Sequence, residues 1–230
     1  NGYTKNVQLM NPGYFDHSHF DLVAIPKHDG IMKATNIVQF IGAPHTISRK
    51  VLHEASERWE NSVNHILHPR ITVLLGGSTL RRKFTAQMAT ELGRHVNNLA
   101  KDKNGGLMIS TSRRTELHVQ NAFMREITVP YELFVWGPEK DNPYIGFLGL
   151  ADSIIVTGES VSMCSEACAT RASVFIYAPS ALITKKHARL HDELYEGGYA
   201  SPLMGALKEM GRKRLNSADD IAKIIRKKLM

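Results

Sequence analysis

Cysteine is scarce in this sequence: Cys164 and Cys168 are the only two among 230 residues. So small a number excludes a disulfide-stabilised scaffold and is typical of proteins from a reducing compartment. Their i, i+4 spacing would place both thiols on one face of a helix, but no nearby pair of histidines completes a metal site. We therefore expect two small, buried side chains.

Long apolar runs are also absent. No segment approaches the roughly 20 apolar residues that a membrane-spanning helix needs. Residues 1–14 contain neither a basic leader nor an apolar signal core. With 43% hydrophobic and 22% charged residues, the composition is that of a globular protein long enough to bury a core. We expect a cytoplasmic protein, with peripheral contact to a membrane as an open alternative.

Several motifs with known chemistry are missing. There is no GxGxxG after the first predicted strand, no GxxxxGK(S/T) phosphate loop, no HExxH among the 11 histidines and no DxD pair for a divalent metal. No tyrosine is followed four residues later by lysine, the pair that nicotinamide-dependent epimerases normally carry. These absences argue against a dinucleotide cofactor and a metal site, and they disfavour an epimerase.

Acidic residues are few near the C-terminus. The net charge is +7, and residues 201–230 hold eight lysines and arginines against three acidic residues, a local excess of +5. Such a basic region can bind an anionic membrane surface, although a solvated helix face that tolerates lysines is the favoured alternative. Because no aromatic residues alternate with these charges, we do not expect a nucleic-acid groove.

Short apolar runs alternate with amphipathic stretches along most of the chain. The pattern predicts strands at residues 7–10, 20–25, 36–41, 71–75, 106–109, 131–136 and 153–156, and a further strand ending at Tyr177. Helices are predicted after Ser48, around residues 88–99 and 116–125, at residues 161–170, and after Ser217, which would form a capping box with Asp220. This alternation predicts an α/β fold with a parallel, doubly wound sheet.

Two domains are expected, at residues 1–68 and 69–230. The first holds three strand candidates but only one convincing helix. Parallel strands need crossover connections, which are usually helical. We therefore expect an incomplete N-terminal Rossmann-like lobe, followed by a C-terminal Rossmann-like lobe.

Polar loops follow three predicted strands of the second domain, at residues 76–79, 110–115 and 157–160. Ligands bind beyond the carboxyl ends of strands in an open parallel sheet, and loops that open a helix expose N–H groups that bind phosphate. Each loop alone is better explained as a tight turn, but the three together, two with basic residues nearby, favour a phosphate-bearing ligand. The candidate ligand-binding residues are Gly76, Gly77, Ser78, Ser112, Arg113, Arg114, Ser160 and Ser162, with Glu166 for a ribose hydroxyl.

The motifs SRRT at residues 112–115, DNPY at 141–144 and TGESVSMCSEA at 157–167 resemble those of a known family. The family comprises the plant mitochondrial fission factor named for elongated mitochondria and its bacterial relatives, which are often labelled nucleoside-diphosphate-sugar epimerases. The likeness covers most of residues 7–177. One departure is Arg171-Ala172-Ser173, where related sequences commonly read Gly-Lys-Pro, which changes how one helix ends and the next strand begins.

That family is similar to GT-B glycosyltransferases. The resemblance implies two Rossmann-like lobes that face each other across a cleft, with the nucleotide-sugar donor held by the C-terminal lobe. It places Ser160 and Ser162 in the donor-phosphate loop and Glu166 at the ribose, with Gly77, Ser78, Ser112 and Arg113 along the same cleft.

Three functions remain open. The first is a metal-independent glycosyltransferase that uses a nucleotide-sugar donor, such as a UDP-sugar, and no further cofactor. His28 or His45 would be the base that activates an unknown acceptor. His187 is a further acid/base candidate, and a surface or interdomain position is the alternative for all three histidines. The second function is a non-catalytic scaffold that acts through protein or membrane contacts, and the third, disfavoured, is a nucleotide-sugar epimerase.

Overall fold

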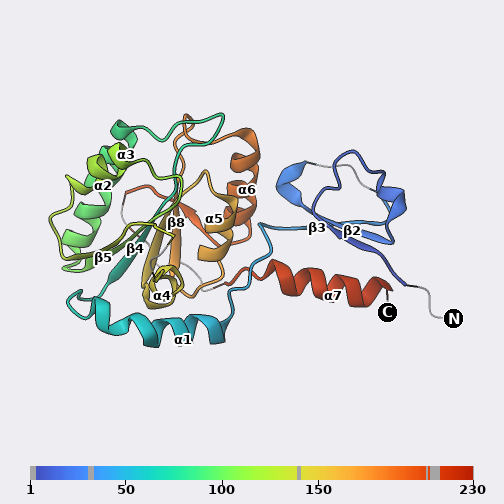
Figure 1. Cartoon of the computed structure of the whole chain (residues 1–230), viewed down its shortest axis with the longest axis horizontal. Helices are drawn as coiled ribbons and strands as arrows, with labels where there is room; N and C mark the ends of the chain where they lie inside the picture. Colours follow the sequence, from blue (N-terminus) through green and yellow to red (C-terminus); the bar gives the residue numbers. More distant parts are fainter. Residues whose placement is uncertain (1–3, 31–33, 139–140, 206, 208–212, 230) are drawn as a thin grey trace.

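Two parallel β-sheets form the framework of the molecule (Figure 1). The computed structural model describes residues 4–30, 34–138, 141–205, 207 and 213–229. The first sheet has the strand order β1-β2-β3 and lies on the right in Figure 1; the second has the order β6-β5-β4-β7-β8-β9. Every pairing in these ranges is parallel, which confirms the predicted sheet type.

The first sheet consists of β1 (Val7–Leu9), β2 (Leu22–Pro26) and β3 (Ile37–Phe40). Every residue of β2 is buried, as befits the central strand of a covered sheet. The short 3₁₀ helices η1 (His17–His19) and η2 (Lys27–Asp29) lie in the two connections, and the described residues between the strands form no α-helix. The expectation that these strands need helical crossovers was therefore wrong. In the described residues, the chain passes from the end of one parallel strand to the start of the next without an α-helix.

The second sheet has the strand order of a doubly wound Rossmann-like sheet. Its strands are β4 (Arg70–Leu75), β5 (Gly106–Thr111), β6 (Tyr131–Phe134), β7 (Ser153–Thr157), β8 (Ser173–Tyr177) and β9 (Ser201–Pro202). The order reverses between β4 and β7, which pair directly. Such a reversal opens a crevice at the carboxyl ends of the two central strands, where ligands bind.

Helices cover both faces of the second sheet. One face carries α2 (Ala86–Asp102) and α3 (Leu117–Met124), and the other carries α1 (Arg49–Trp59), α4 (Tyr144–Leu150), α5 (Val161–Ala167) and α6 (Lys185–Glu196). Leu92 and Val96 of α2 share a core with Ile71, whereas Leu190 of α6 shares the opposite core with Ile154. The result is a three-layer arrangement of helices, sheet and helices.

Some local predictions are confirmed. The Ser48 hydroxyl accepts a hydrogen bond from the Val51 N–H at 3.2 Å and so caps α1. Cys164 and Cys168 are buried free thiols, and burial raises the pKa of both. The sequence interpretation did not include α6 or β9.

The domain boundary expected after residue 68 stays a prediction. Two helices pack against the sheet on the other side of that boundary. α1 precedes that residue and packs against α4 of the second sheet. α7 (Ser217–Leu229) follows it and covers the first sheet, where Ile221 joins Ala24 and Phe40 in a small core. Figure 1 shows α7 running below the first sheet, so the last helix lies beside the strands at the start of the chain.

The start of α7 differs from the prediction. Its cap is Asn216, whose side-chain oxygen accepts the Asp219 N–H at 3.2 Å, and Ser217 is the first helical residue. Ser217 is buried instead, and its hydroxyl donates to the Ile41 carbonyl. The predicted cap at Ser217 was therefore wrong, because its hydroxyl ties α7 to the end of the first sheet.

The outward face of α7 is basic. Its lysines and arginine lie exposed, namely Lys223, Arg226, Lys227 and Lys228. Other residues of the basic C-terminal region, Lys208 and Arg212, fall outside the described residues. None of the helices that the structure describes combines the length and the apolar character needed to cross a bilayer.

We expect Ile221→Ala to lower the free energy of unfolding by about 2 kcal/mol or more, since it removes a buried side chain from the small core between α7 and the first sheet. Urea denaturation followed by circular dichroism measures this loss. Lys227→Ala, on the exposed face of the same helix, should leave the stability within about 0.5 kcal/mol of the parent. Equal stability of the two variants would contradict the observed docking of α7.

Candidate functional site

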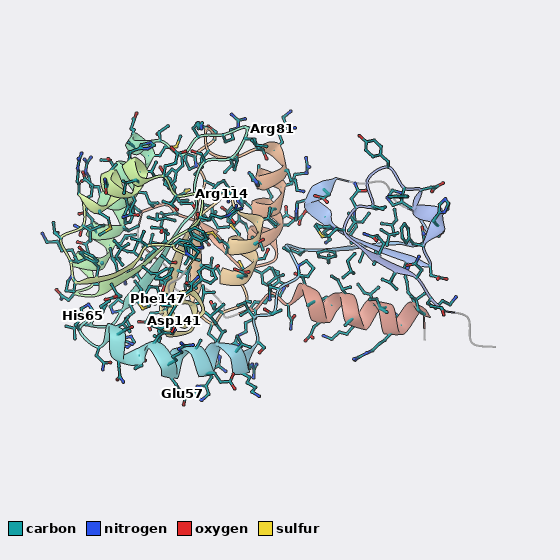
Figure 2. All side chains as sticks on the ribbon, viewed as in Figure 1. Glu57, His65, Arg81, Arg114, Asp141 and Phe147 are labelled. Carbon is teal, nitrogen blue, oxygen red and sulfur yellow. The ribbon has the colours of Figure 1, made fainter. Side chains whose placement is uncertain are left out.

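A cavity of about 790 Å³ lies beyond the carboxyl ends of β4, β5 and β7, next to the point where the strand order reverses. Its lining is rich in polar and charged side chains: the cations Arg81, Lys83 and Arg114, the imidazole of His187, and the acids Glu116 and Glu159. Figure 2 shows Arg81 and Arg114 at the upper end of the second sheet, away from His65 at its lower end. The cavity therefore lies at the carboxyl ends of the strands, where the three polar loops were predicted to come together.

The glycine loop after β4 is packed against the chain itself. The Gly76 N–H donates to Thr157 Oγ1 and the Gly77 N–H to Glu159 Oε1, both at 2.8 Å. A Cβ on Gly76 would lie 1.6 Å from Glu159 Oε1, and one on Gly77 would lie 1.9 Å from the Arg114 carbonyl oxygen. Glycine is thus required for close approach, but the groups that approach are protein atoms, and these two N–H groups are already used.

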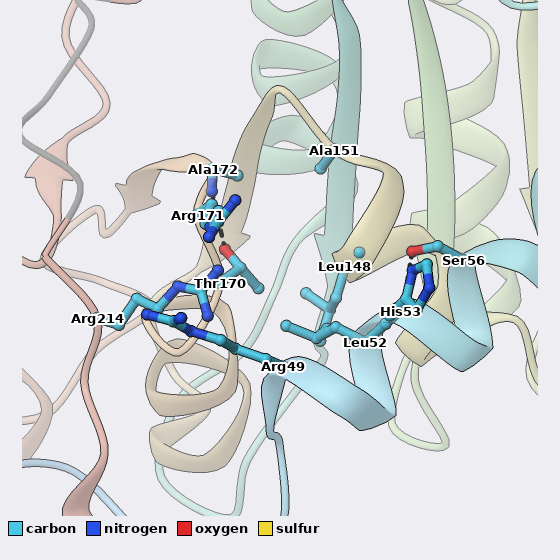
Figure 3. Close-up of a pocket in the computed structure, with 11 residues that line it drawn as sticks. Arg49, Leu52, His53, Ser56, Leu148, Ala151, Thr170, Arg171, Ala172 and Arg214 are labelled. Carbon is cyan, nitrogen blue, oxygen red and sulfur yellow. Dashed lines mark hydrogen bonds between the residues drawn. The ribbon is translucent and has the colours of Figure 1, made fainter.

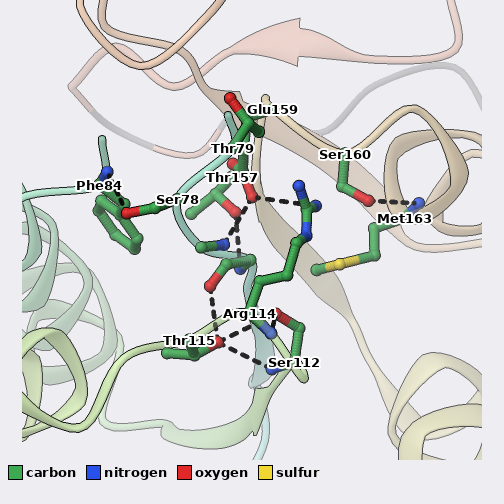
Figure 4. Close-up of polar contacts among 12 residues, drawn as sticks. Ser78, Thr79, Phe84, Ser112, Arg114, Thr115, Thr157, Glu159, Ser160 and Met163 are labelled. Atoms are coloured by element: carbon green, nitrogen blue, oxygen red, sulfur yellow. Dashed lines mark hydrogen bonds and ion pairs between the residues drawn. The ribbon is translucent and has the colours of Figure 1, made fainter. Parts of the chain in front are cut away.

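The loop after β5 is a tight turn that is tied to the glycine loop. The Ser112 N–H donates to Thr115 Oγ1 at 2.9 Å, and the Arg114 N–H donates to Ser112 Oγ at 3.2 Å. The Thr115 hydroxyl donates to the Gly76 carbonyl at 2.6 Å (Figure 4). The predicted residue Ser112 therefore shapes the turn that presents Arg114.

The two predicted arginines, Arg113 and Arg114, lie in different surroundings. Arg114 lines the cavity and its Nη2 lies 3.8 Å from Glu159 Oε1, whereas Arg113 is exposed to solvent. In Figure 4 the Arg114 guanidinium points toward Glu159, with Ser160 on its other side. The structure thus brings Arg114 to the cavity, and Arg113, which the resemblance placed there, does not line it.

Glu159 lies at the centre of the three loops. Burial raises the pKa of its carboxyl group, and the hydrogen bond from the Gly77 N–H and the charge of Arg114 partly offset this effect. Its Oε2 has no hydrogen-bond partner among the described residues. The sequence reasoning noted this residue only as part of a loop; the available signal was a carboxylate directly after a buried strand.

Two of the predicted serines, Ser78 and Ser160, accept hydrogen bonds from nearby backbone N–H groups. Ser78 lines the cavity, and its Oγ accepts the Phe84 N–H at 3.2 Å. Ser160 caps α5 by accepting the Met163 N–H at 3.4 Å, and Ser162 is exposed. Their role as donor-phosphate ligands stays a prediction.

Glu166, on α5, and His45, on the linker before α1, lie close together. The Tyr144 hydroxyl donates to Glu166 Oε2 at 2.6 Å. The linker that carries His45 is held on α5 by a hydrogen bond from the Ala43 N–H to Ser165 Oγ at 2.8 Å. Burial lowers the pKa of His45, and the nearby charge of Glu166 counteracts part of that shift. In the described structure neither Glu166 nor His45 is among the residues that line the cavity.

His28 lies at the contact between η2 and α6 and is 1% exposed. Arg189 Nε donates to the His28 carbonyl at 2.8 Å, and Lys186 Nζ lies 2.5 Å from Asp29 Oδ1. Burial lowers the pKa of His28 to about 4, and the positive charges of Lys186 and Arg189 contribute. The imidazole is therefore neutral at pH 7.

His187, the third candidate, lines the cavity from the first turn of α6. Its Nδ1 accepts the Thr184 N–H at 3.2 Å, so the neutral ring carries its proton on Nε2. Burial lowers the pKa of His187, with further contributions from the charges of Lys186 and Arg114. Lys83, Glu116 and Thr184 also line the cavity, and the sequence reasoning did not propose them.

We expect Glu159→Ala to lower the free energy of unfolding by about 1–3 kcal/mol, because it leaves the buried Gly77 N–H without an acceptor. Glu159→Gln keeps an oxygen at that position and should retain more of the stability. Thermal and urea unfolding of both variants measure the difference. Equal losses in the two variants would show that the acceptor to Gly77 is not what holds the loop.

The lowered pKa of His28 predicts a dependence of stability on pH. In the unfolded chain the imidazole takes up a proton below pH 6.5, but the folded protein resists it down to about pH 4. The contribution of His28 to stability is therefore full above pH 6.5 and is lost as the pH falls toward 4. Unfolding free energies measured across this range should fall less in His28→Gln than in the parent, whereas the exposed control His118→Gln should follow the parent; parallel curves for all three proteins would refute this.

Comparison with solved structures identifies the fold. UDP-GlcNAc 2-epimerase from Neisseria meningitidis, bound to UDP-GlcNAc, matches with a TM-score of 0.51 at 11% identity, over 90% of this chain and 54% of that one. MurG of Acinetobacter baumannii matches with a TM-score of 0.47 at 13% identity, over 90% of this chain and 61% of that one. The match to the epimerase and the strand order of the second sheet show that the chain has a GT-B-like α/β fold, as predicted.

Comparison with curated proteins identifies relatives. Mitochondrial fission protein ELM1 of Arabidopsis thaliana is 26% identical over 195 residues, which cover 74% of this chain and 44% of that protein. Protein RP120 of Rickettsia prowazekii (strain Madrid E) is 30% identical over 260 aligned residues, covering 96% of this chain and 72% of that protein. The chain thus spans less than half the length of its Arabidopsis relative. The model of the family "Mitochondrial fission ELM1" matches residues 1–229, and the chain therefore belongs to the mitochondrial fission ELM1 family.

Proposed function

We propose that the cavity binds the diphosphate of a nucleotide-sugar donor, such as a UDP-sugar, and that the chain acts as a metal-independent glycosyltransferase. The observation that carries this proposal is the set of basic side chains, Arg81, Lys83 and Arg114, around a cavity at the reversal of the strand order. The GT-B-like fold supports it, since the epimerase with this fold was solved with UDP-GlcNAc bound. A cavity of about 790 Å³ suits a ligand of nucleotide-sugar size.

Arg114 is the proposed principal phosphate ligand. Its backbone is fixed by the turn at Ser112, and Glu159 orients its guanidinium. A guanidinium held in this way binds a diphosphate through charge-assisted hydrogen bonds and stabilises the negative charge that develops as the diphosphate leaves. The neutral His187, with its proton on Nε2, supplies a further donor at the same cavity.

Glu166 and a histidine are the proposed contacts for the ribose and the acceptor. The Tyr144 hydroxyl occupies Glu166 Oε2, which leaves Oε1 to accept from ribose hydroxyl groups. Of the two predicted bases, His45 lies beside Glu166, and His28 lies near His187 at the contact between η2 and α6. Either ring is neutral at pH 7 and so can accept the proton of an acceptor hydroxyl.

A non-catalytic scaffold is the second candidate function. The observation that favours it is the basic outer face of α7, whose cations point away from the core formed with the first sheet. A cationic helix face is suited to a surface of anionic lipids or to an acidic protein. In this case the cavity beyond β4, β5 and β7, called the donor cavity from here on, would bind a nucleotide without turnover.

Arg114→Ala is expected to weaken UDP binding by about tenfold to a hundredfold, because it removes a charge-assisted hydrogen bond to phosphate. Isothermal titration calorimetry on the full chain measures the change. Arg113→Ala is the matched control, since it removes the neighbouring exposed guanidinium, and its affinity should stay within about threefold of the parent. Absence of UDP binding to the parent, or equal weakening in the two variants, would refute the proposed site.

Turnover is tested separately by incubating the protein with a UDP-sugar and analysing the products. Release or transfer of the sugar supports a glycosyltransferase, and an epimerised UDP-sugar identifies the disfavoured third function. UDP binding without any product supports the scaffold, which then predicts retention on anionic vesicles.

A further inference from the structure

A second cavity, of about 410 Å³, lies at the opposite end of the second sheet from the donor cavity. Its walls come from α1, from the end of α4, from the loop 170–172 that precedes β8, and from Arg214. Because β7 and β8 are parallel, residues that precede them mark their amino ends, whereas Glu159 and Arg114 follow strands. Arg171, where the sequence departs from the related pattern, lies here and not at the donor cavity.

Three guanidinium groups converge on this cavity, those of Arg49, Arg171 and Arg214 (Figure 3). The residues that line it include no aspartate or glutamate. Within the described ranges, none of the three arginines has a carboxylate within salt-bridge distance or a side-chain hydrogen bond. Burial lowers the pKa of Arg214, and so do the charges of Arg171 and Arg49, which means that the three cations repel one another.

Several arginines elsewhere in the described structure pair with carboxylates: Arg58, Arg70, Arg94 and Arg114 lie within salt-bridge distance of Asp141, Glu60, Glu126 and Glu159 respectively. Arginine remains protonated in proteins, so three guanidinium groups around one cavity, with no carboxylate partner among the described residues, repel one another while the site is empty. A bound anion would remove that repulsion.

The remaining walls define the size and character of the ligand. Leu52 and Leu148 form an apolar floor. The two hydroxyls at the cavity are engaged with the protein backbone, Ser56 with the Leu52 carbonyl at 2.7 Å and Thr170 with the Ala167 carbonyl at 2.8 Å. The one other polar side chain among these lining residues is His53, whose Nε2 lies 3.5 Å from Glu57 Oε1. Recognition therefore rests mainly on the guanidinium groups, whose planar fork matches phosphate oxygens.

We propose that Arg49, Arg171 and Arg214 form a phosphate-binding site, separate from the donor cavity, that takes a phosphate monoester. The monoester can belong to a free phosphorylated molecule or to the headgroup of an anionic lipid such as phosphatidic acid. The apolar floor accommodates the carbon atoms next to the phosphate in either case. The site does not depend on the proposed glycosyl transfer, because the two cavities share no residue.

The site is tested by titrating inorganic phosphate and glycerol 3-phosphate into the full chain at constant ionic strength, with chloride as the reference anion. Arg114→Ala serves as the background, so that phosphate binding at the donor cavity does not contribute. Arg171→Gln and Arg214→Gln should each weaken binding by about tenfold or more. Arg125→Gln removes an exposed arginine at the C-terminal end of α3, away from this cavity, and should leave the affinity unchanged.

Two further measurements complete the test. Without phosphate, Arg171→Gln should raise the melting temperature slightly, because it relieves repulsion among the guanidinium groups. Phosphatidylcholine vesicles with and without phosphatidic acid distinguish the sources: retention that Arg171→Gln abolishes indicates a lipid headgroup, whereas binding of glycerol 3-phosphate without retention indicates a free molecule. Phosphate binding that is absent, or equal in the Arg171, Arg214 and Arg125 variants, would overturn the proposal.

Discussion

The buried carboxylate of Glu159 is the contact on which the candidate donor site depends. It accepts the Gly77 N–H at 2.8 Å and lies 3.8 Å from Arg114 Nη2, so it joins the loops that follow β4, β5 and β7. Its carboxyl group is buried, and hydrogen bonds from its own backbone, from Gly77 and from Thr157, together with the charge of Arg114, offset part of the cost of desolvation. The same contact explains why residues 76 and 77 are glycines: a Cβ at either position would overlap Glu159 or the backbone of Arg114.

The strands of a parallel sheet all have their carboxyl ends on one side and their amino ends on the other, and arginines lie at both sides of the second sheet. At the carboxyl edge, Arg114 is held by Glu159 before any ligand arrives, which suits a site that must orient a diphosphate. At the amino ends of the strands, Arg171 and Arg214 line the same cavity, and the residues that line it include no carboxylate. The first arrangement is organised by its own ion pair, whereas the second has no such pair among its lining residues.

Local features were predictable because neighbouring residues in the chain determine them. The alternation of apolar runs and amphipathic stretches predicted the parallel α/β class, and Ser48 was identified as a cap from its position before an apolar stripe. The same reasoning failed at Ser217, since its hydroxyl bonds to Ile41, which is distant in sequence. It also did not find α6, whose buried residues Leu190 and Leu194 are few among charged neighbours.

By itself, the sequence determined the fold class, the family resemblance and the three polar loops after strands, because each depends on local order and spacing. Only the tertiary structure decided which side chains of those loops meet. In the folded chain Arg114 lines the cavity and Arg113 does not, and Glu159 lies between the three loops. The Gly76 and Gly77 N–H groups donate to protein side chains. The physical reason is that a hydrogen bond or ion pair between loops depends on the register of paired strands, which brings together residues about 80 positions apart in the chain.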